Sequence, residues 1–546
     1  MSGPPGRSPD VALTGGTVYR IAGERATGDG LLVRGGRIVA VGAGSDIRAA
    51  AAPGTVTIDL GGRVVLPAFI DSHTHFHRGA VLRRLFLDFD TLRPMSVGEV
   101  CRLVAERAAG TAPGAWIQGD SLSAVRLAEG RLPDRHELDA AAPRHPVVLR
   151  GIGKHVVAAN SAALSAAGID RTTKAPAGGR IEHDEHGEPS GILHETAKLR
   201  LDQSHPETVV PQPAAAEREA ALIAGFGDLH AAGIATIHEM IRLPEEAGDL
   251  AALHARGELG VRVRLYYRVH ESPLSLDWLV ALGIRRGLGD DWLKVLGVKI
   301  SVDGFCIFRN AAVHEPYAGQ PDNLGLLRIE DERLGTLVRE ANAAGLNVAV
   351  HAVGARAVDL ALDAFAAAGP AVAGPHRLEH GYVDMDRPRL DRMRGLGLVW
   401  STQPAFCAGY AAEWLDAFGP DRAARLMPLR AGAEAGLTML FNSDFPCVGF
   451  DPLVAIRQAV PRLVAGGDGD DAALRAARIA AWRACTTTPA EVAGDSTLGR
   501  IDAGTLADLV VLDRDPFDAR TDLADVAVRA TMVGGRLVHG SSELGG

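Results

Sequence analysis

Five apolar segments of this chain each end in a histidine, lysine or aspartate, and this repetition constrains the fold more than any other feature of the sequence. The segments are LPAFIDSHTHF at 66–76, VLGVKISVDG at 295–304, LNVAVHAVG at 346–354, HRLEH at 376–380 and TMLFNSD at 438–444. In the second segment, Leu296, Val298 and Ile300 alternate with more polar residues such as Lys299, as in a β-strand. The pattern predicts strands with polar side chains at their carboxyl ends.

Helical patterns lie between these predicted strands. DERLGTLVREANAAG at 331–345 and RAVDLALDAFAAAG at 356–369 repeat apolar residues at helical spacing, and a glycine ends each pattern. Alternating strands and helices form parallel βα units, whose strand ends face substrate in a (β/α)8 TIM barrel. The eight predicted barrel strands are 65–72, 234–239, 262–268, 295–301, 346–351, 376–380, 397–402 and 437–443.

His73 and His75 are the first pair of predicted metal ligands. Two residues apart on an extended backbone, their imidazoles project from the same face of the strand. A histidine pair alone is weak evidence, because surface histidines can have this spacing by chance. The later strand ends add Lys299, His351, His380 and Asp444, which together predict a metal site at one end of the barrel.

The length of 546 residues predicts two or three domains. Glycine-punctuated short strands at both termini predict one small β-sandwich from residues 1–64 and 490–546. The barrel then takes 65–77 and 226–489. The interval after the first barrel strand is too long for a βα loop, so we expect residues 78–225 to form an inserted cap domain that carries substrate contacts.

The sequence resembles the amidohydrolase superfamily, in particular its amidohydrolase-3 branch of YtcJ-like and N-substituted formamide deformylase-like proteins. Besides the strand segments, the matching motifs include WIQGDSLS, GEPSGILHE, RLEHGYV, TQPAF, NSDFPCVGF and GTLADLVVLDRDPF. They occur in the family's order over about residues 18–538. One departure is Asn442 in NSD, where these proteins commonly have glycine, and its side chain is expected to point inward.

The resemblance implies a divalent metal, with zinc expected, as one or two ions. His73 and His75 would bind the first ion, His351 and His380 the second, and Lys299, carboxylated by carbon dioxide, would bridge them. The alternative for Lys299 is an unmodified side chain paired with Asp303. In the implied catalysis Asp444 contacts the first ion and acts as general base, and His380 or His351 stabilises the oxyanion.

Five further residues are candidates for substrate binding, and each has a structural role as its alternative. They lie in family-like segments near predicted strand ends or in the cap: His155, Glu195, Asp303, Arg309 and Gln403.

Composition and net charge limit the classes of binding partner that we expect for this protein. A formal net charge of −10 argues against a nucleic-acid or anionic membrane surface, and leaves a small molecule as the expected substrate. Five scattered cysteines without CxxC spacing, and no apolar leader or span, are typical of a cytoplasmic protein. Oligomeric state is open, with a homodimer as the candidate.

We expect hydrolysis of a C–N bond in an amide or N-substituted formamide. The same scaffold can instead act on a lactone, carbamate or cyclic amide, or catalyse a non-hydrolytic reaction such as decarboxylation. A catalytically silent binding protein is the third alternative. It is disfavoured because a silent barrel is expected to lose ligands, and here the predicted set is complete.

Overall fold

The computed structural model describes residues 9–25, 28–151, 156–176, 179–202, 208–464 and 470–541. The chain forms two compact units, one of Met1–His77 with Ile223–Gly546 and one of Arg78–Leu222. Among the described residues, no helix combines the length and the apolar character needed to cross a membrane.

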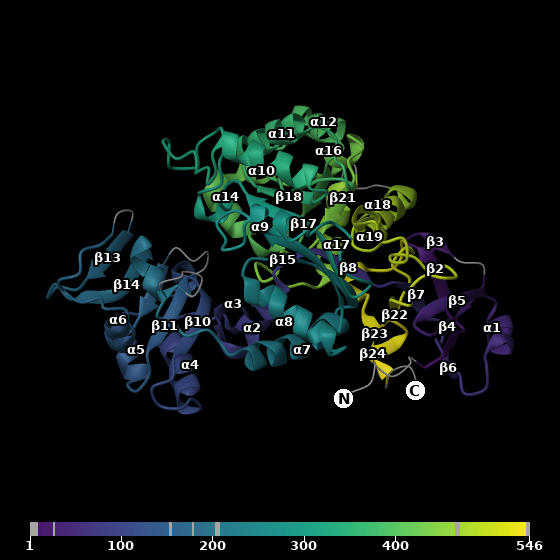
Figure 1. Cartoon of the computed structure of the whole chain (residues 1–546), viewed down its shortest axis with the longest axis horizontal. Coiled ribbons are helices and arrows are strands. Elements are labelled where there is room, and N and C mark those ends of the chain that lie inside the picture. Colours follow the sequence, from purple (N-terminus) through teal and green to yellow (C-terminus); the bar gives the residue numbers. More distant parts are fainter. Residues whose placement is uncertain are drawn as a thin grey trace. The chain divides into compact units, whose positions relative to one another are not determined.

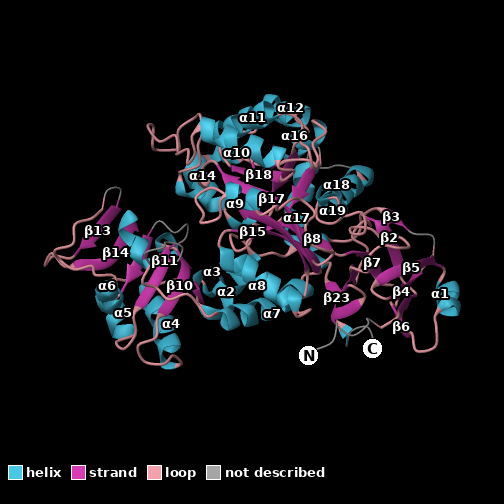
Figure 2. Ribbon diagram, viewed as in Figure 1, coloured by secondary structure: helices cyan, strands magenta, loops and turns pink. Residues whose placement is uncertain are grey.

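The first unit contains a parallel sheet whose neighbouring strands pair in chain order. Helices lie outside two of these strands, β17 (Leu293–Ser301) and β18 (Asn347–Ala352), in Figure 2: α10 (Asp331–Ala343), α11 (Ala355–Ala368), α12 (Arg387–Gly395) and α16 (Leu429–Glu434). Backbone hydrogen bonds from Asp444 to His73 (2.9 Å) and from His75 to Phe445 (2.8 Å) join the last strand end to the first. The sheet therefore closes into a (β/α)8 barrel, which confirms the predicted fold class. Its strands are β8 (Phe69–Thr74), β15 (Ile234–Ile241), β16 (Arg262–Arg268), β17 (Leu293–Ser301), β18 (Asn347–Ala352), β19 (Arg377–His380), β20 (Val399–Thr402) and β21 (Met439–Phe441).

Helices follow the barrel strands and bury their apolar stripes. In α11, Val358, Leu362 and Phe365 are buried at the spacing of one helix face, as the sequence predicts. The principal helices of this unit are α8 (Pro244–Ala255), α10 (Asp331–Ala343), α11 (Ala355–Ala368), α12 (Arg387–Gly395), α16 (Leu429–Glu434), α17 (Pro452–Leu463), α18 (Asp471–Arg483) and α19 (Thr487–Ala493).

Strands from both ends of the chain form a β-sandwich in the same unit. Figure 1 shows the purple amino-terminal strands beside the yellow carboxyl-terminal ones, and β7 (Val64–Pro67) pairs with β22 (Leu509–Leu512). Residues of both sheets, such as Leu13 and Val511, share one apolar core. One sheet has the order β5 (Arg37–Gly42), β4 (Gly30–Arg34), β1 (Val11–Thr14), β6 (Val56–Asp59), and the other β24 (Arg536–His539), β23 (Val528–Val533), β22 (Leu509–Leu512), β7 (Val64–Pro67), β2 (Thr17–Ile21), β3 (Glu24–Arg25).

The first barrel strand begins later than predicted. The expected strand at 65–72 is divided between β7, in the sandwich, and β8, in the barrel. The amide of Ala68 still donates to Asp508 of the carboxyl-terminal segment, whereas the amide of Phe69 donates to Gly233 ahead of the second barrel strand. A continuous apolar run therefore crosses from one sheet to the next, and hydrophobic periodicity carries no sign of the change.

The second unit is inserted in sequence between β8 and β15 and has its own apolar core. Helices α4 (Val97–Ala109), α5 (Arg135–Ala141) and α6 (Ser161–Ala166) belong to it. Its mixed sheet has the order β13 (Gly179–His183), β14 (Pro189–Glu195), β12 (Val156–Ala159), β11 (Val147–Gly151), β10 (Ile117–Leu122), β9 (Leu87–Asp88).

Candidate metal centre

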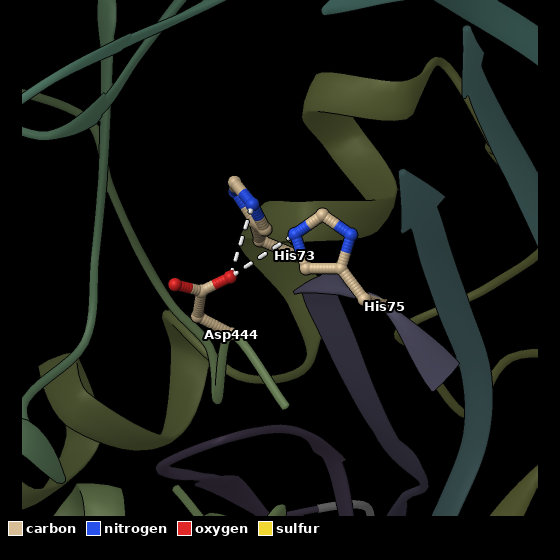
Figure 3. A group of neighbouring side chains, drawn as sticks. All are labelled: His73, His75 and Asp444. Carbon is tan, nitrogen blue, oxygen red and sulfur yellow. Dashed lines mark ion pairs between the residues drawn. The ribbon is translucent and has the colours of Figure 1, made fainter. Parts of the chain in front are cut away.

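His73, His75 and Asp444 meet at the closing seam of the barrel (Figure 3). One ligand atom from each lies within 4.8 Å of the others. The Asp444 Oδ1 atom is 3.4 Å from His73 Nε2 and 3.5 Å from His75 Nε2. The two histidines come from the end of β8 and Asp444 from the turn after β21, so the backbone bonds that close the barrel also set this group.

Two of the predicted ligands lie in left-handed backbone conformations. His380 has φ +71° and Asp444 has φ +51°. Residues with a Cβ rarely adopt this region, and such outliers gather at functional sites where surrounding structure holds them. His380 is the last residue of β19, and Asp444 lies in the turn that follows β21.

Lys299, His351 and His380 lie beside this group. Lys299 Nζ is 3.2 Å from His73 Nε2. The His380 ring centroid is 5.3 Å from that of His73 and 4.4 Å from that of His351. All six residues predicted as ligands, from five strand ends, therefore converge in the structure.

Burial keeps the three inner imidazoles neutral. Desolvation lowers the pKa of His351 and of His380 to about 3, and desolvation with the charge of Lys299 lowers the pKa of His73. Burial opposes ionisation of Asp444, but its hydrogen bond with His75 and the nearby histidines outweigh burial and hold its pKa well below its usual range. Neutral imidazoles with an ionised carboxylate are the donor set that zinc takes in proteins, so these residues fit such an ion.

The ring nitrogens that face away from the centre have acceptors in the protein. His73 Nδ1 lies 2.5 Å from Glu379 Oε2, and His380 Nδ1 lies 2.9 Å from Gln403 Oε1. His351, the third of the inner histidines, places Nε2 3.0 Å from the carbonyl oxygen of Gly304. Such contacts orient metal-binding imidazoles and fix their tautomers. This leaves Nε2 of His73 and His380, and Nδ1 of His351, to bind an ion.

Comparison with known proteins shows to which family the chain belongs. The model of the amidohydrolase family matches residues 56–539. This chain belongs to the amidohydrolase family. The amidohydrolase is 30% identical to the Arabidopsis thaliana protein LONG AFTER FAR-RED 3, over 99% of this chain and 93% of that protein.

Two more similarities extend over nearly the whole amidohydrolase. It is 28% identical to N-substituted formamide deformylase of Arthrobacter pascens, over 97% of this chain and 98% of the relative. A crystal structure of a metal-dependent hydrolase of Pyrococcus horikoshii aligns with a TM-score of 0.75 at 25% identity, covering 94% of this chain and 99% of that one. The chain is thus a hydrolase of the metal-dependent amidohydrolase superfamily.

Two candidate substrate residues of the amidohydrolase have their polar atoms occupied by protein. The Asp303 carboxylate accepts backbone N–H groups of Ala312, Val353 and Gly354 at 2.9 Å each, and its Oδ1 lies 3.4 Å from Nε2 of the neutral His351. Gln403 is fully buried between His380 and Asn442. Both side chains hold their neighbours in place, which is the structural alternative for each.

The other three candidate substrate residues are Arg309, Glu195 and His155. Arg309 pairs with Asp416 at 2.7 Å and donates to the carbonyl of Ala318. Glu195 ends β14 in the second unit, with φ +49°. His155 lies outside the described residues, so its substrate role stays a prediction.

The sequence did not single out Glu379 or Arg377 as part of the site. Both lie in HRLEH directly before His380, and both are fully buried. The sequence signal that could have identified them is their position in a predicted barrel strand that ends in a ligand. The contact of Glu379 with His73, 306 residues away, is visible only in the fold.

Proposed function

We propose that this amidohydrolase hydrolyses a C–N bond in an amide or N-substituted formamide, using one or two divalent metal ions, with zinc as the expected metal. The observation that carries the proposal is the convergence of the Asp444 carboxylate with His73 and His75. The similarity to a protein named N-substituted formamide deformylase supports the substrate class.

The ligands divide into two groups in this proposal. His73, His75 and Asp444 would hold the first ion, and His351 with His380 would hold the second. Lys299 lies between the groups, and burial lowers its pKa to about 8. A neutral amine is the form that reacts with carbon dioxide, so the lowered pKa favours the carbamate that would bridge two ions.

A divalent ion supplies a Lewis acid that polarises the substrate carbonyl and lowers the pKa of water towards ~7. Asp444 accepts the proton of the attacking water and returns it to the leaving amine. Its lowered pKa keeps it ionised and ready to accept. Nδ1 of His380 is hydrogen bonded to Gln403, so Nε2 is the nitrogen of His380 that remains for the second ion.

A substrate screen tests the proposal. Zinc-loaded protein is offered N-formyl amines, N-acyl amines, carbamates and lactones, beside the variants Asp444→Asn and Asp363→Asn. Asp363 is an exposed residue paired with Arg392 and serves as the matched control. Turnover of N-formyl or N-acyl amines that is lost in Asp444→Asn and kept in Asp363→Asn is the expected result. Turnover of lactones alone, or full activity of Asp444→Asn, would contradict the proposal.

A further inference from the structure

Behind His73 and His380 lies a group of polar side chains that the reaction itself does not use. They are at most 4% exposed and come from β19, β20 and the segment after β21: Arg377, Glu379, Ser401, Gln403 and Asn442. Buried polar groups are costly unless hydrogen bonded, so the direction of each bond can be deduced from the donors and acceptors present.

Glu379 fixes one end of the group. Arg377 pairs with both oxygens of this carboxyl group, so Glu379 is a carboxylate and can only accept. Its Oε2 lies 2.5 Å from His73 Nδ1, and Arg377 lies 2.6 Å from Oε1 and donates to Oε2 at 3.0 Å. His73 must therefore carry its proton on Nδ1.

Ser401 continues the group from Glu379. Its Oγ accepts from Arg377 Nη2 at 2.9 Å and from Asn442 Nδ2 at 3.0 Å. The same Arg377 Nη2 also donates to Glu379 Oε2, so this guanidinium links the carboxylate to the serine. The Ser401 oxygen is thereby held as the acceptor of the Asn442 amide.

Asn442 and Gln403 carry this orientation to His380. Asn442 Nδ2 donates to Ser401, so its Oδ1 is free to accept from Gln403 Nε2 at 2.7 Å. Gln403 Oε1 then faces His380 Nδ1 at 2.9 Å, which makes that nitrogen the donor. The reverse orientation of both amides would aim an NH2 group at His380 Nδ1 and move the imidazole proton to Nε2, where it would block metal binding.

We infer that Glu379, Arg377, Ser401, Asn442 and Gln403 form one hydrogen-bonded relay that sets the tautomers of His73 and His380 together, with Asn442 as the link between its two halves. These five are positioning residues, because they act through the histidines. The relay rests on the proposed metal-binding function of those histidines. It makes the orientation of the His380 imidazole depend on a carboxylate that contacts the other histidine.

Metal affinity of Asn442→Ala tests the relay. Asn342→Ala is the matched control, because Asn342 is an equally buried amide in α10 that hydrogen bonds backbone groups of Ala368, Pro370 and Val372. Zinc affinity is measured on metal-free protein by competition with a chelator. We expect about ten-fold weaker binding or more for Asn442→Ala, as for other partners of metal-bound histidines, and no change for Asn342→Ala. Equal affinities in the two variants would overturn the relay.

Gln403→Met provides a second variant that keeps the side-chain volume and removes both amide contacts. Combined with Asn442→Ala it should cost little more than either single change, because both break the same connection. Fully additive losses would contradict a common relay.

The tautomer can also be read without metal or substrate. In metal-free protein with 15N-labelled histidine, the His380 signal, assigned with His380→Gln, should report a protonated Nδ1 in wild type. In Asn442→Ala it should shift towards the other tautomer, and an unchanged signal counts against the relay. Wild-type protein that binds no zinc would contradict the proposed function, whereas this spectrum would still decide the relay.

Discussion

The backbone amide of Asp444 donates to the carbonyl oxygen of His73 at 2.9 Å. This bond joins the segment after the last barrel strand to the carboxyl end of the first, so closing the barrel also brings the Asp444 carboxylate to the two histidines. Because the bond uses backbone atoms only, a change of either side chain leaves it in place. Effects of such changes on metal binding can therefore be separated from effects on folding.

Zinc should stabilise the wild-type protein, and His75→Asn should lose most of this effect. A ligand that binds only the folded state adds about 2.7 kcal/mol at 100 times its dissociation constant. Thermal midpoints with and without zinc measure the gain. His136→Asn, at an exposed histidine of the second unit, is the control and should keep it. A midpoint in wild type that zinc leaves unchanged would count against the metal centre.

Replacing Glu379 by Gln should destabilise the metal-free protein by about 3–5 kcal/mol, because Arg377 becomes an unpaired buried charge. The Arg377 guanidinium lies over the Tyr266 ring, 5.1 Å from its centroid, and has no exposed surface. Urea unfolding measures the loss. The double variant Arg377→Met/Glu379→Gln removes both charges and should recover part of the stability, whereas a double variant less stable than Glu379→Gln would contradict this reason.

A buried ion pair should also hold the carboxyl-terminal segment to the barrel. Arg262 of β16 binds both oxygens of Asp508, at 2.7 and 3.0 Å, and both residues are buried. Asp508→Asn should lower the unfolding free energy by about 3–5 kcal/mol. Asp525→Asn, which breaks the exposed pair of Asp525 with Arg514, should cost at most about 1 kcal/mol. Equal losses in the two variants would refute a special role for the buried pair.

The sequence predicted the barrel and the convergence of its strand-end residues because both depend on local patterns. Lys299, His351 and His380 each end a segment whose apolar periodicity is visible in the chain, and parallel topology brings such ends together. The division of one apolar run between β7 and β8 was not predictable, because both parts are equally buried.

The contacts of the site's supporting residues were not predictable either. Asn442 was expected to point inward, but its partners Gln403 and Ser401 lie on another strand, and only the fold brings the three amide and hydroxyl groups together. Whether Gln403 binds substrate or positions a neighbour could not be decided from its segment. Its two hydrogen bonds in the structure favour positioning.

The two inner histidines should make the metal-free protein less stable in acid. Desolvation lowers the pKa of His351 and of His380 to about 3 in the folded chain, from 6.5. At pH values between these two pKa values, the unfolded chain binds protons at the two histidines and the folded chain does not. The unfolding free energy therefore falls as the pH falls from about 6.5 towards about 3. The slope should be about 1.4 kcal/mol per pH unit for each histidine between about pH 4.5 and 5.5.

The double variant His351→Gln/His380→Gln isolates this contribution. Burial raises the pKa of Asp303 to about 7 and that of Asp71 to about 6, which acts in the opposite direction in both proteins. His380 lowers the pKa of Asp303, so its loss in the variant raises that pKa further and makes the acid destabilisation smaller still. Urea unfolding of metal-free wild type and double variant across this range should therefore show the shallower pH dependence in the variant. Parallel pH profiles would mean that the two imidazoles take up protons equally well in the folded and unfolded chains, contrary to their burial at the centre.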